Sequence, residues 1–306
     1  MRPTQGMRKA NEESMRAPCA RSMPARLCSA VSTGPSTGNP SLCSTLLPSG
    51  LQGTEITSGA PDTPRWYGED LAYIHDVGHA EFALGTAPSI LEILDRNGIH
   101  DGLVVDLGCG SGLWARELVD AGYRVLGIDI SEAMIELSRN RVPEAEFRVG
   151  SLFEVEIPRC QAITAVSEVL NYLFDAENEE RGLGRLFRRV HDALVPGGVF
   201  VFDVLGPGQV PPGTRARDFR VGEDWAVLAE REEDVERGTM ERRLVSFRKA
   251  GEHYRRDDEV HRVRLYDPSE LSAGLEQAGF RVRTMRSYGA HPLSEGHAAF
   301  VARKPA

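Results

Sequence analysis

The sequence predicts an α/β fold in which a doubly wound sheet carries helices on both faces. From Trp66 onward, strand and helix signals alternate along the chain. Leu103–Leu107 is short and nearly all apolar, which is typical of a strand that is covered on both faces. The glycine-rich segment Gly108–Gly112 lies directly between this strand and the next helix, where such folds bind ligands above the sheet.

The first part of the folded region alternates short helices and strands. Pro88 suits the first turn of a helix, and Asn97-Gly98 is expected to end it. Ser131 can cap a later helix. Apolar patterning predicts the other elements in order: a strand at Leu103–Leu107, a helix with Trp114, Leu118 and Ala121 facing inward, a strand at Arg124–Asp129, a helix with Met134, Ile135 and Leu137, and strands at Glu146–Val149 and Gln161–Val166.

The pattern changes after the fifth strand, which we predict at Gly198–Leu205. Before that strand we predict a helix that contains Leu183, Leu186, Phe187 and Val190. This helix is expected to end at Pro196-Gly197-Gly198. Residues 214–263 contain β-leaning runs separated by glycines, which predict an antiparallel β insertion that covers the substrate. Asp267-Pro268-Ser269-Glu270 then begins a helix that ends at Gly279, and two closing strands follow at Phe280–Tyr288 and Ala298–Lys304.

Residues 1–60 differ in composition from the rest of the chain. Ser, Thr, Gly and Pro occupy 27 of these 60 positions, and no apolar period is sustained. Such a segment cannot bury enough surface to offset the entropy of ordering, so we predict a disordered leader at 1–60 and a single domain at 61–306. The leader is interpreted as a tail, an early start codon or an Arg- and Ser-rich transit peptide.

Charge and cysteine content restrict the partners of this protein. The net charge is −9, and residues 1–60 carry six basic and three acidic side chains, so the remaining residues are strongly acidic. A negatively charged folded region repels the phosphate backbone of nucleic acid, so its charge favours a small-molecule partner. No apolar run is long enough for a membrane span. Only Cys109 and Cys160 lie in the folded part, which is typical of a reducing, cytoplasmic location. The oligomeric state stays open, and no metal-ligand spacing is present.

Asp129 completes a ligand-binding pattern with the glycine-rich segment. It stands 19 residues after Gly110, at the predicted end of the next strand. An acid at this spacing can accept hydrogen bonds from ribose hydroxyls. A dinucleotide fingerprint needs a third glycine where this chain has Leu113, and Asp106 places a carboxylate beside the loop. That carboxylate suits a cationic ligand, such as an ammonium or a sulfonium, and S-adenosylmethionine carries both.

Val104–Gly112 resembles the first motif of class I S-adenosylmethionine-dependent methyltransferases. The resemblance continues through Gly127–Ser131 with Met134, through Ser167–Leu173 and through Leu194–Gly198. It implies a Rossmann-like sheet of seven strands with the last strand antiparallel. It also implies S-adenosylmethionine as cofactor and methyl transfer to an oxygen, nitrogen or carbon atom of a small molecule.

The resemblance also implies roles for individual residues. Gly108 and Gly110 would contact the methionine end of the cofactor, Asp129 would hold the ribose, and Ile130 would pack on the adenine. Ser151 stands where such enzymes often place an acid on the adenine amino group, so the backbone of Leu152 would take over that contact. Ser167 would lie near the methionine moiety, and Tyr73 would close over the cofactor. The expected cofactor-binding residues are Tyr73, Asp106, Gly108, Cys109, Gly110, Asp129, Ile130, Met134, Ser151, Leu152 and Ser167.

The catalytic residues are less defined by the sequence. His261 and Tyr254, both in the insertion, are candidate general bases. Two other functions stay open: a catalytically silent S-adenosylmethionine-binding regulatory protein, and an NAD(P)-dependent oxidoreductase.

Overall fold

The computed structural model describes residues 66–174 and 182–306, which belong to a compact unit spanning residues 59–306. The predicted leader and its boundary at residue 60 lie outside the described residues. Within the described part of the chain, no helix combines the length and the apolar character needed to cross a membrane.

A seven-stranded sheet, called sheet A here, forms the centre of this unit. Its strand order is β10-β13-β5-β4-β1-β2-β3. The neighbours from β5 to β3 run parallel, and β13 runs antiparallel to both β5 and β10, which confirms the predicted topology. The strands are β1 (Leu103–Leu107), β2 (Arg124–Asp129), β3 (Glu146–Val149), β4 (Cys160–Ala165), β5 (Leu194–Leu205), β10 (Arg281–Met285) and β13 (His297–Arg303).

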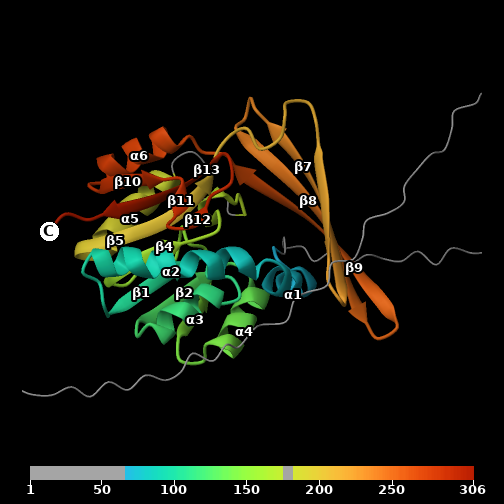
Figure 1. Ribbon diagram of the computed structural model, residues 1–306, viewed down its shortest axis with the longest axis horizontal. Coiled ribbons are helices and arrows are strands. Elements are labelled where there is room, and N and C mark those ends of the chain that lie inside the picture. Colours follow the sequence, from blue (N-terminus) through green and yellow to red (C-terminus); the bar gives the residue numbers. More distant parts are fainter. Residues whose placement is uncertain (1–65, 175–181) are drawn as a thin grey trace, which may run out of the picture. The chain divides into compact units, whose positions relative to one another are not determined.

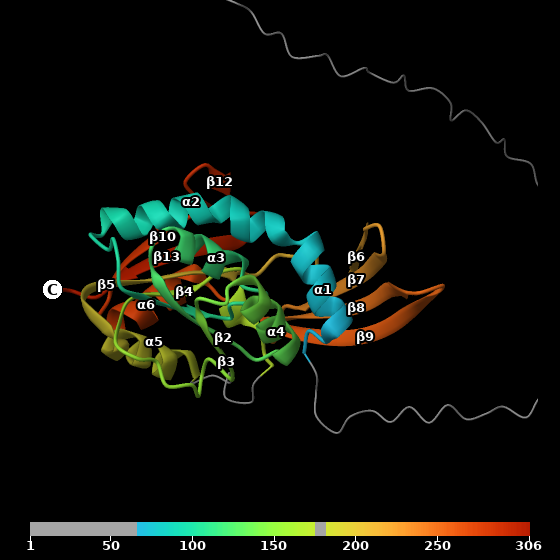
Figure 2. The same ribbon diagram turned by 90° about the horizontal axis from the view of Figure 1, so that it is seen from below.

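Helices cover both faces of sheet A, as Figure 2 shows. On one face lie α2 (Ala80–Arg96), α3 (Leu113–Asp120) and α4 (Glu132–Arg141), and on the other α5 (Gly182–Ala193) and α6 (Pro268–Gln277). Two cores result, one around Ile90 and Trp114 and one around Phe187 and Phe202. Strand order reverses between β1 and β4, so their carboxyl ends meet at a switch point where such folds bind ligands.

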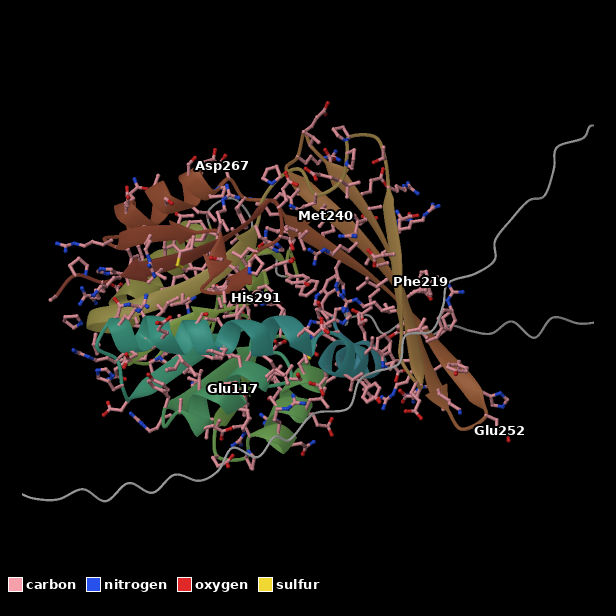
Figure 3. All side chains as sticks on the ribbon, in the orientation of Figure 1. Glu117, Phe219, Met240, Glu252, Asp267 and His291 are labelled. Atoms are coloured by element: carbon pink, nitrogen blue, oxygen red, sulfur yellow. The ribbon has the colours of Figure 1, made fainter. Side chains whose placement is uncertain are left out.

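The predicted insertion is a second, antiparallel sheet, called sheet B here. It consists of β6 (Ala216–Val221), β7 (Trp225–Asp234), β8 (Thr239–Ala250) and β9 (His253–Arg264). Helix α1 (Glu69–Gly78) lies beside sheet B (Figure 1). Its Leu71 and Ile74 pack against Trp225 and Val227 on the inner face of that sheet. Phe219 projects from the outer face and is 74% exposed (Figure 3).

The structure corrects the predicted start of the first helix. Pro88 lies inside α2, which begins at Ala80 rather than at the proline. Proline removes one helical hydrogen bond, at a cost of about 3 kcal/mol. Ala87, Ile90 and other residues around it are buried, so packing of this apolar face outweighs the loss.

Three further boundaries differ from the prediction. Ala121 is exposed because it caps the end of α3 instead of facing the core. β5 begins at Leu194, so Pro196-Gly197-Gly198 lies within the strand and not before it. The strand predicted at Phe280–Tyr288 divides into β10 and β11 (Ser287–Tyr288), since β11 leaves sheet A to pair with β12 (His291–Pro292). The predicted caps at Ser131 and Asp267 are confirmed, because each side chain accepts from a backbone N–H of its helix.

Candidate functional site

A cavity of about 530 Å³ lies between the carboxyl edge of sheet A and the inner face of sheet B. Its size is typical of sites for small molecules. We call the wall at the carboxyl edge of sheet A the sheet A side, and the wall at the inner face of sheet B the sheet B side. Strand alternation places every second residue of β7, β8 and β9 on the inner face, so Val227, Ala229, Leu244 and His261 contribute to the sheet B side.

The glycine loop after β1 forms part of the sheet A side. The N–H groups of Gly108 and Cys109 donate to the carbonyl oxygen of Ile128 at 2.7 and 3.0 Å, which holds the loop against β2. Gly108 and Gly110 have φ angles of +68° and +53°, in the left-handed region. No atom lies within 4 Å of the position that a Cβ on Gly110 would take. A ligand can therefore approach the main chain of Gly110 from the cavity.

Asp129 links this loop to the end of β2. Its Oδ2 accepts from the N–H of Gly110, and its Oδ1 accepts from the N–H of Ser131, both at 2.9 Å. Burial raises the pKa of the Asp129 carboxyl, while these backbone N–H groups act in the opposite direction. Each carboxylate oxygen can accept a second hydrogen bond, so Asp129 can hold the loop and still accept from a ligand's hydroxyl groups.

Most of the expected cofactor-binding residues lie together on the sheet A side. Eight of them line the cavity: Gly108, Gly110, Asp129, Ile130, Met134, Ser151, Leu152 and Ser167. The hydroxyl oxygen of Ser151 accepts from the N–H of Phe153 at 3.0 Å and so stabilises the turn after β3. The combination of an open glycine backbone, an acid at the strand end and an apolar wall at Ile130 and Met134 fits the adenosine and methionine parts of S-adenosylmethionine.

Three expected cofactor-binding residues do not line the cavity. Asp106 on β1 is 2% exposed, and its carboxylate accepts from the hydroxyl of Thr164 at 2.7 Å. Burial raises the pKa of Asp106 to about 7. Cys109 is also buried outside the cavity, and burial raises the pKa of its thiol.

Tyr73 is the third residue whose placement differs. It lies outside the cavity because α1 directs its ring to sheet B, where the guanidinium of Arg248 stacks 3.7 Å from the ring centroid. Its hydroxyl donates to Asp224. Of the two candidate bases, His261 lines the cavity, whereas Tyr254 is 56% exposed near the tip of the β8–β9 hairpin and does not.

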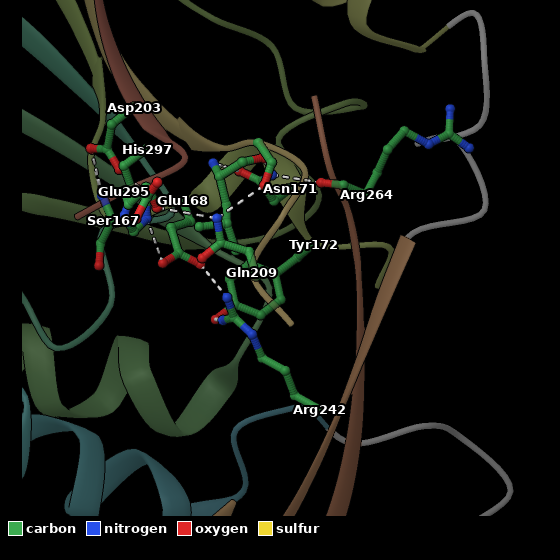
Figure 4. Close-up of polar contacts among 12 residues, drawn as sticks. Ser167, Glu168, Asn171, Tyr172, Asp203, Gln209, Arg242, Arg264, Glu295 and His297 are labelled. Carbon is green, nitrogen blue, oxygen red and sulfur yellow. Dashed lines mark hydrogen bonds and ion pairs between the residues drawn. The ribbon is translucent and has the colours of Figure 1, made fainter. Parts of the chain in front are cut away.

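A partly buried ion-pair network occupies the junction of the two walls (Figure 4). Glu168 Oε2 lies 2.5 Å from Arg242 Nη2, and Glu168 Oε1 lies 2.9 Å from His297 Nε2. Burial opposes ionisation of Glu168, but Arg242 and His297 outweigh it and lower its pKa to about 2. Glu168 is therefore an anion that connects β4, β8 and β13.

Backbone strain accompanies this network. Ser167 and Glu168 have φ angles of +76° and +61°, which are unfavourable for residues other than glycine. Asp203 of β5 holds both, because its two carboxylate oxygens accept from their N–H groups at 2.9 Å. Burial raises the pKa of Asp203 to about 6. The strained turn directs the Glu168 side chain to Arg242 while Ser167 remains on the cavity wall.

Several residues that line the cavity were not expected from the sequence. They are Tyr67, His75, Glu168, Tyr172, Phe174, Arg242 and His297. A carboxylate that follows a parallel strand at its carboxyl end is a usable signal, and Glu168 provides it. No local pattern marks Arg242 or His297, since they reach Glu168 from elements more than 70 residues away.

Gly110→Ala tests the open approach to the loop. The added methyl group would enter the cavity, so we expect the affinity for S-adenosylhomocysteine, the demethylated cofactor, to fall by about tenfold or more. The strain of a left-handed alanine should cost about 1–2 kcal/mol of stability. Gly98→Ala is the matched control, because Gly98 has a φ of +76° and open space around it but lies outside the cavity. Calorimetry should show equal affinity for that control and the parent. Equal affinity for Gly110→Ala would contradict a cofactor at this loop.

Comparison with known proteins agrees with this geometry. Residues 104–198 match the family model described as a methyltransferase domain. The dTDP-3-amino-3,4,6-trideoxy-alpha-D-glucopyranose N,N-dimethyltransferase of Streptomyces venezuelae is 25% identical over 223 residues, covering 71% of this chain and 92% of that protein. A dTDP-4-amino-2,3,4,6-tetradeoxy-D-glucose N,N-dimethyltransferase of Saccharopolyspora spinosa is 25% identical over 239 residues, covering 74% and 92%.

Solved structures share the fold. A S-adenosylmethionine-dependent methyltransferase from Clostridium acetobutylicum has a TM-score of 0.66 at 19% identity, covering 77% of this chain and 98% of that one. The sugar N-methyltransferase KedS8 from a Streptoalloteichus species also has a TM-score of 0.66 at 19% identity, covering 84% and 100%. Together with the glycine loop, Asp129 and the strand order of sheet A, these matches support the prediction of a class I S-adenosylmethionine-dependent methyltransferase, with a methyltransferase domain at residues 104–198.

Proposed function

We propose that this enzyme methylates an amino group of a small polar molecule, with amino sugars as the favoured class. The supporting observation is the composition of the cavity wall around the proposed acceptor space. Tyr67, Tyr172 and Phe174 provide aromatic faces there, and the carboxylate of Glu81 also lines the cavity. Two further lining carboxylates are paired with arginines, Glu168 with Arg242 and Asp218 with Arg231. Aromatic rings and carboxylates favour a cationic ligand such as a protonated amine.

The relatives support the same acceptor class. Two relatives whose sequences align over most of their length are named for N,N-dimethylation of dTDP-linked amino sugars. The cavity of about 530 Å³ has room for a cofactor with a small acceptor beside it.

The roles of the two walls follow from their residues. When bound, the cofactor supplies an electrophilic methyl group on a sulfonium. We assign Gly110, Asp129, Ile130 and Met134 to binding it, with its methionine end near Ser167. The sheet B side would then hold the acceptor in line with the methyl group, and such positioning supplies much of the rate enhancement of methyl transfer.

A panel of acceptors tests this proposal. The chain is incubated with S-adenosylmethionine and dTDP-3-amino-3,4,6-trideoxy-D-glucose, its 4-amino counterpart, or the sugars with a hydroxyl in place of the amine. Mass spectrometry should show added methyl groups on the amines and none on the hydroxyl analogues. Methylation of the hydroxyl analogues alone, or of no member of the panel, would contradict the proposed acceptor class.

Ala229→Phe tests sheet B as the cover of the acceptor. Ala229 lies on the inner face of β7 and lines the cavity, so a phenyl ring there should fill the acceptor space. We expect methyl transfer to fall by about tenfold or more, with S-adenosylhomocysteine affinity unchanged within about threefold. Ala226→Phe, on the outer face of the same strand, is the control and should change neither quantity. A loss of cofactor affinity in a folded Ala229→Phe protein would assign this wall to the cofactor instead.

A further inference from the structure

A buried carboxylate–imidazole pair lies in the sheet B side and has no part in holding the cofactor. His261 Nε2 lies 2.7 Å from Glu259 Oε2, and the two side chains are only 1% and 7% exposed. Both residues are on the inner face of β9, two positions apart, which is the spacing that directs side chains to the same face. His261 also lines the cavity.

Glu259 is fixed before any ligand binds. Its two oxygens accept from the backbone N–H groups of Tyr67 and Gly68, both at 2.8 Å. Among the described residues, no lysine or arginine forms an ion pair with Glu259, so its negative charge faces His261 without a competing cation.

This arrangement determines which nitrogen of His261 can react. A carboxylate only accepts hydrogen bonds, so the neutral imidazole carries its hydrogen on Nε2 and leaves a lone pair on Nδ1. Nδ1 is buried and has no hydrogen-bond partner in the described part of the chain. A buried acceptor without a partner is unfavourable, and a hydrogen bond from a ligand's N–H or O–H would satisfy it.

The surroundings of His261 are otherwise mostly aromatic. The ring centroids of Tyr67 and Phe174 lie 4.8 and 5.0 Å from its own, and Tyr172 and Trp66 lie slightly farther away. The titratable or charged groups that face it are Glu259 on its own strand, Arg242 opposite on β8, Tyr67 before α1, His75 on α1 and Tyr172 after β4. Arg242 is paired with Glu168 and not with Glu259. The carboxylate of Glu259 can therefore stabilise a proton on the His261 ring.

Two other cavity histidines, His75 and His297, are less suited to accept a proton. Burial and the neighbouring His79 lower the pKa of His75 to about 4, which makes it a weak base. His297 also contacts a carboxylate, but that carboxylate is Glu168, whose charge already balances Arg242. His261 thus combines a carboxylate that is not paired with an arginine or lysine and a ring nitrogen without a hydrogen-bond partner among the described residues.

We propose that His261 Nδ1 accepts the proton released by the methyl acceptor, and that Glu259 is the positioning residue that orients the ring. The protonated amine first gives one proton to Nδ1, and Glu259 balances the resulting imidazolium. The lone pair freed on the nitrogen then forms the new bond to the methyl carbon, and the carbon–sulfur bond breaks with its electrons on sulfur. This assignment rests on the proposed function for its acceptor, but the state of the ring can be measured without one.

Nitrogen-15 NMR of the imidazole groups provides that measurement. The full chain is labelled and saturated with S-adenosylhomocysteine in mildly alkaline buffer, and the His261 signal is assigned by its loss in His261→Asn. We expect hydrogen on Nε2 and none on Nδ1. In Glu259→Gln, whose amide can also donate, the two tautomers should mix. Hydrogen on Nδ1 of the parent protein would overturn the proposal whether or not an acceptor has been found.

Kinetics with dTDP-3-amino-3,4,6-trideoxy-D-glucose test the proton transfer itself. His261→Asn should lower kcat by about 10²–10⁴-fold, as expected for loss of a general base, with S-adenosylhomocysteine affinity unchanged within about threefold. The deficit should shrink as the pH rises, because more of the amine then arrives without its proton. A purely structural role for His261 would give a deficit that is independent of pH.

A matched substitution on the same strand provides the control. His253→Asn, at an exposed position near the tip of the β8–β9 hairpin, should leave kcat and its pH profile unchanged. A pH-dependent deficit in His297→Asn with none in His261→Asn would move the role to His297 and overturn the proposal. No turnover with any amine would contradict the proposed function, and the NMR result would still decide the assignment of His261.

Discussion

Asp129→Ala should weaken S-adenosylhomocysteine binding by about a hundredfold. In the proposed cofactor site this carboxylate accepts from two ribose hydroxyls, and hydrogen bonds to a charged group contribute about 1.5–3 kcal/mol each. The substitution also removes the acceptor for the N–H groups of Gly110 and Ser131, so the glycine loop loses its link to β2. Calorimetry on the folded variant gives the affinity directly.

Two variants sharpen this prediction. Asp129→Asn keeps one acceptor oxygen and should have a smaller effect than the alanine. Asp192→Ala removes an exposed carboxylate on α5 and should leave the affinity within about threefold of the parent. Unchanged affinity in a folded Asp129→Ala protein would show that the cofactor's ribose lies elsewhere.

Glu168→Gln should lower the free energy of unfolding at neutral pH by about 3 kcal/mol or more. Removing one partner of a buried ion pair leaves the other charge uncompensated, which is strongly destabilising. Here the remaining charge is that of Arg242, whose side chain is 17% exposed. Denaturant unfolding of parent and variant measures the difference.

The pH dependence provides a second readout for Glu168. Its pKa is lowered from an ordinary value of 4.5 to about 2, so its ionised form stabilises the fold above pH 4.5. That contribution, about 3 kcal/mol by linkage, is lost as the pH falls from 4.5 toward 2. Glu168→Gln should remove this part of the acid sensitivity. Glu92→Gln, in an exposed pair with Arg96, should change stability by about 0.5 kcal/mol or less and keep the parent's acid profile. An unaltered acid profile in Glu168→Gln would show that the network does not control stability.

The cofactor side of the site could be predicted because its parts are close together in the sequence. The glycine loop and Asp129 belong to consecutive β-α-β elements. The alternation of short apolar strands and amphipathic helices is sufficient to predict the order of these elements along the chain. Parallel strands bring their carboxyl ends to one edge, so residues that follow different strands converge without any knowledge of packing. The antiparallel insertion was predicted for a similar reason, since glycines separate its β-leaning runs.

The sheet B side of the site depended on contacts that no local pattern records. Tyr67 donates its N–H to Glu259, 192 residues later, and Arg242 crosses to Glu168 only because the strand register of sheet B places it on the inner face. The orientation of α1 likewise decided that Tyr73 faces Arg248 rather than the cavity. By itself, the sequence determined the fold class, because it follows from local periodicity, and its motifs indicated the cofactor through their resemblance to those of class I S-adenosylmethionine-dependent methyltransferases. Only the tertiary structure decided which charged and aromatic side chains surround the acceptor, because register and helix packing place residues that are distant along the chain.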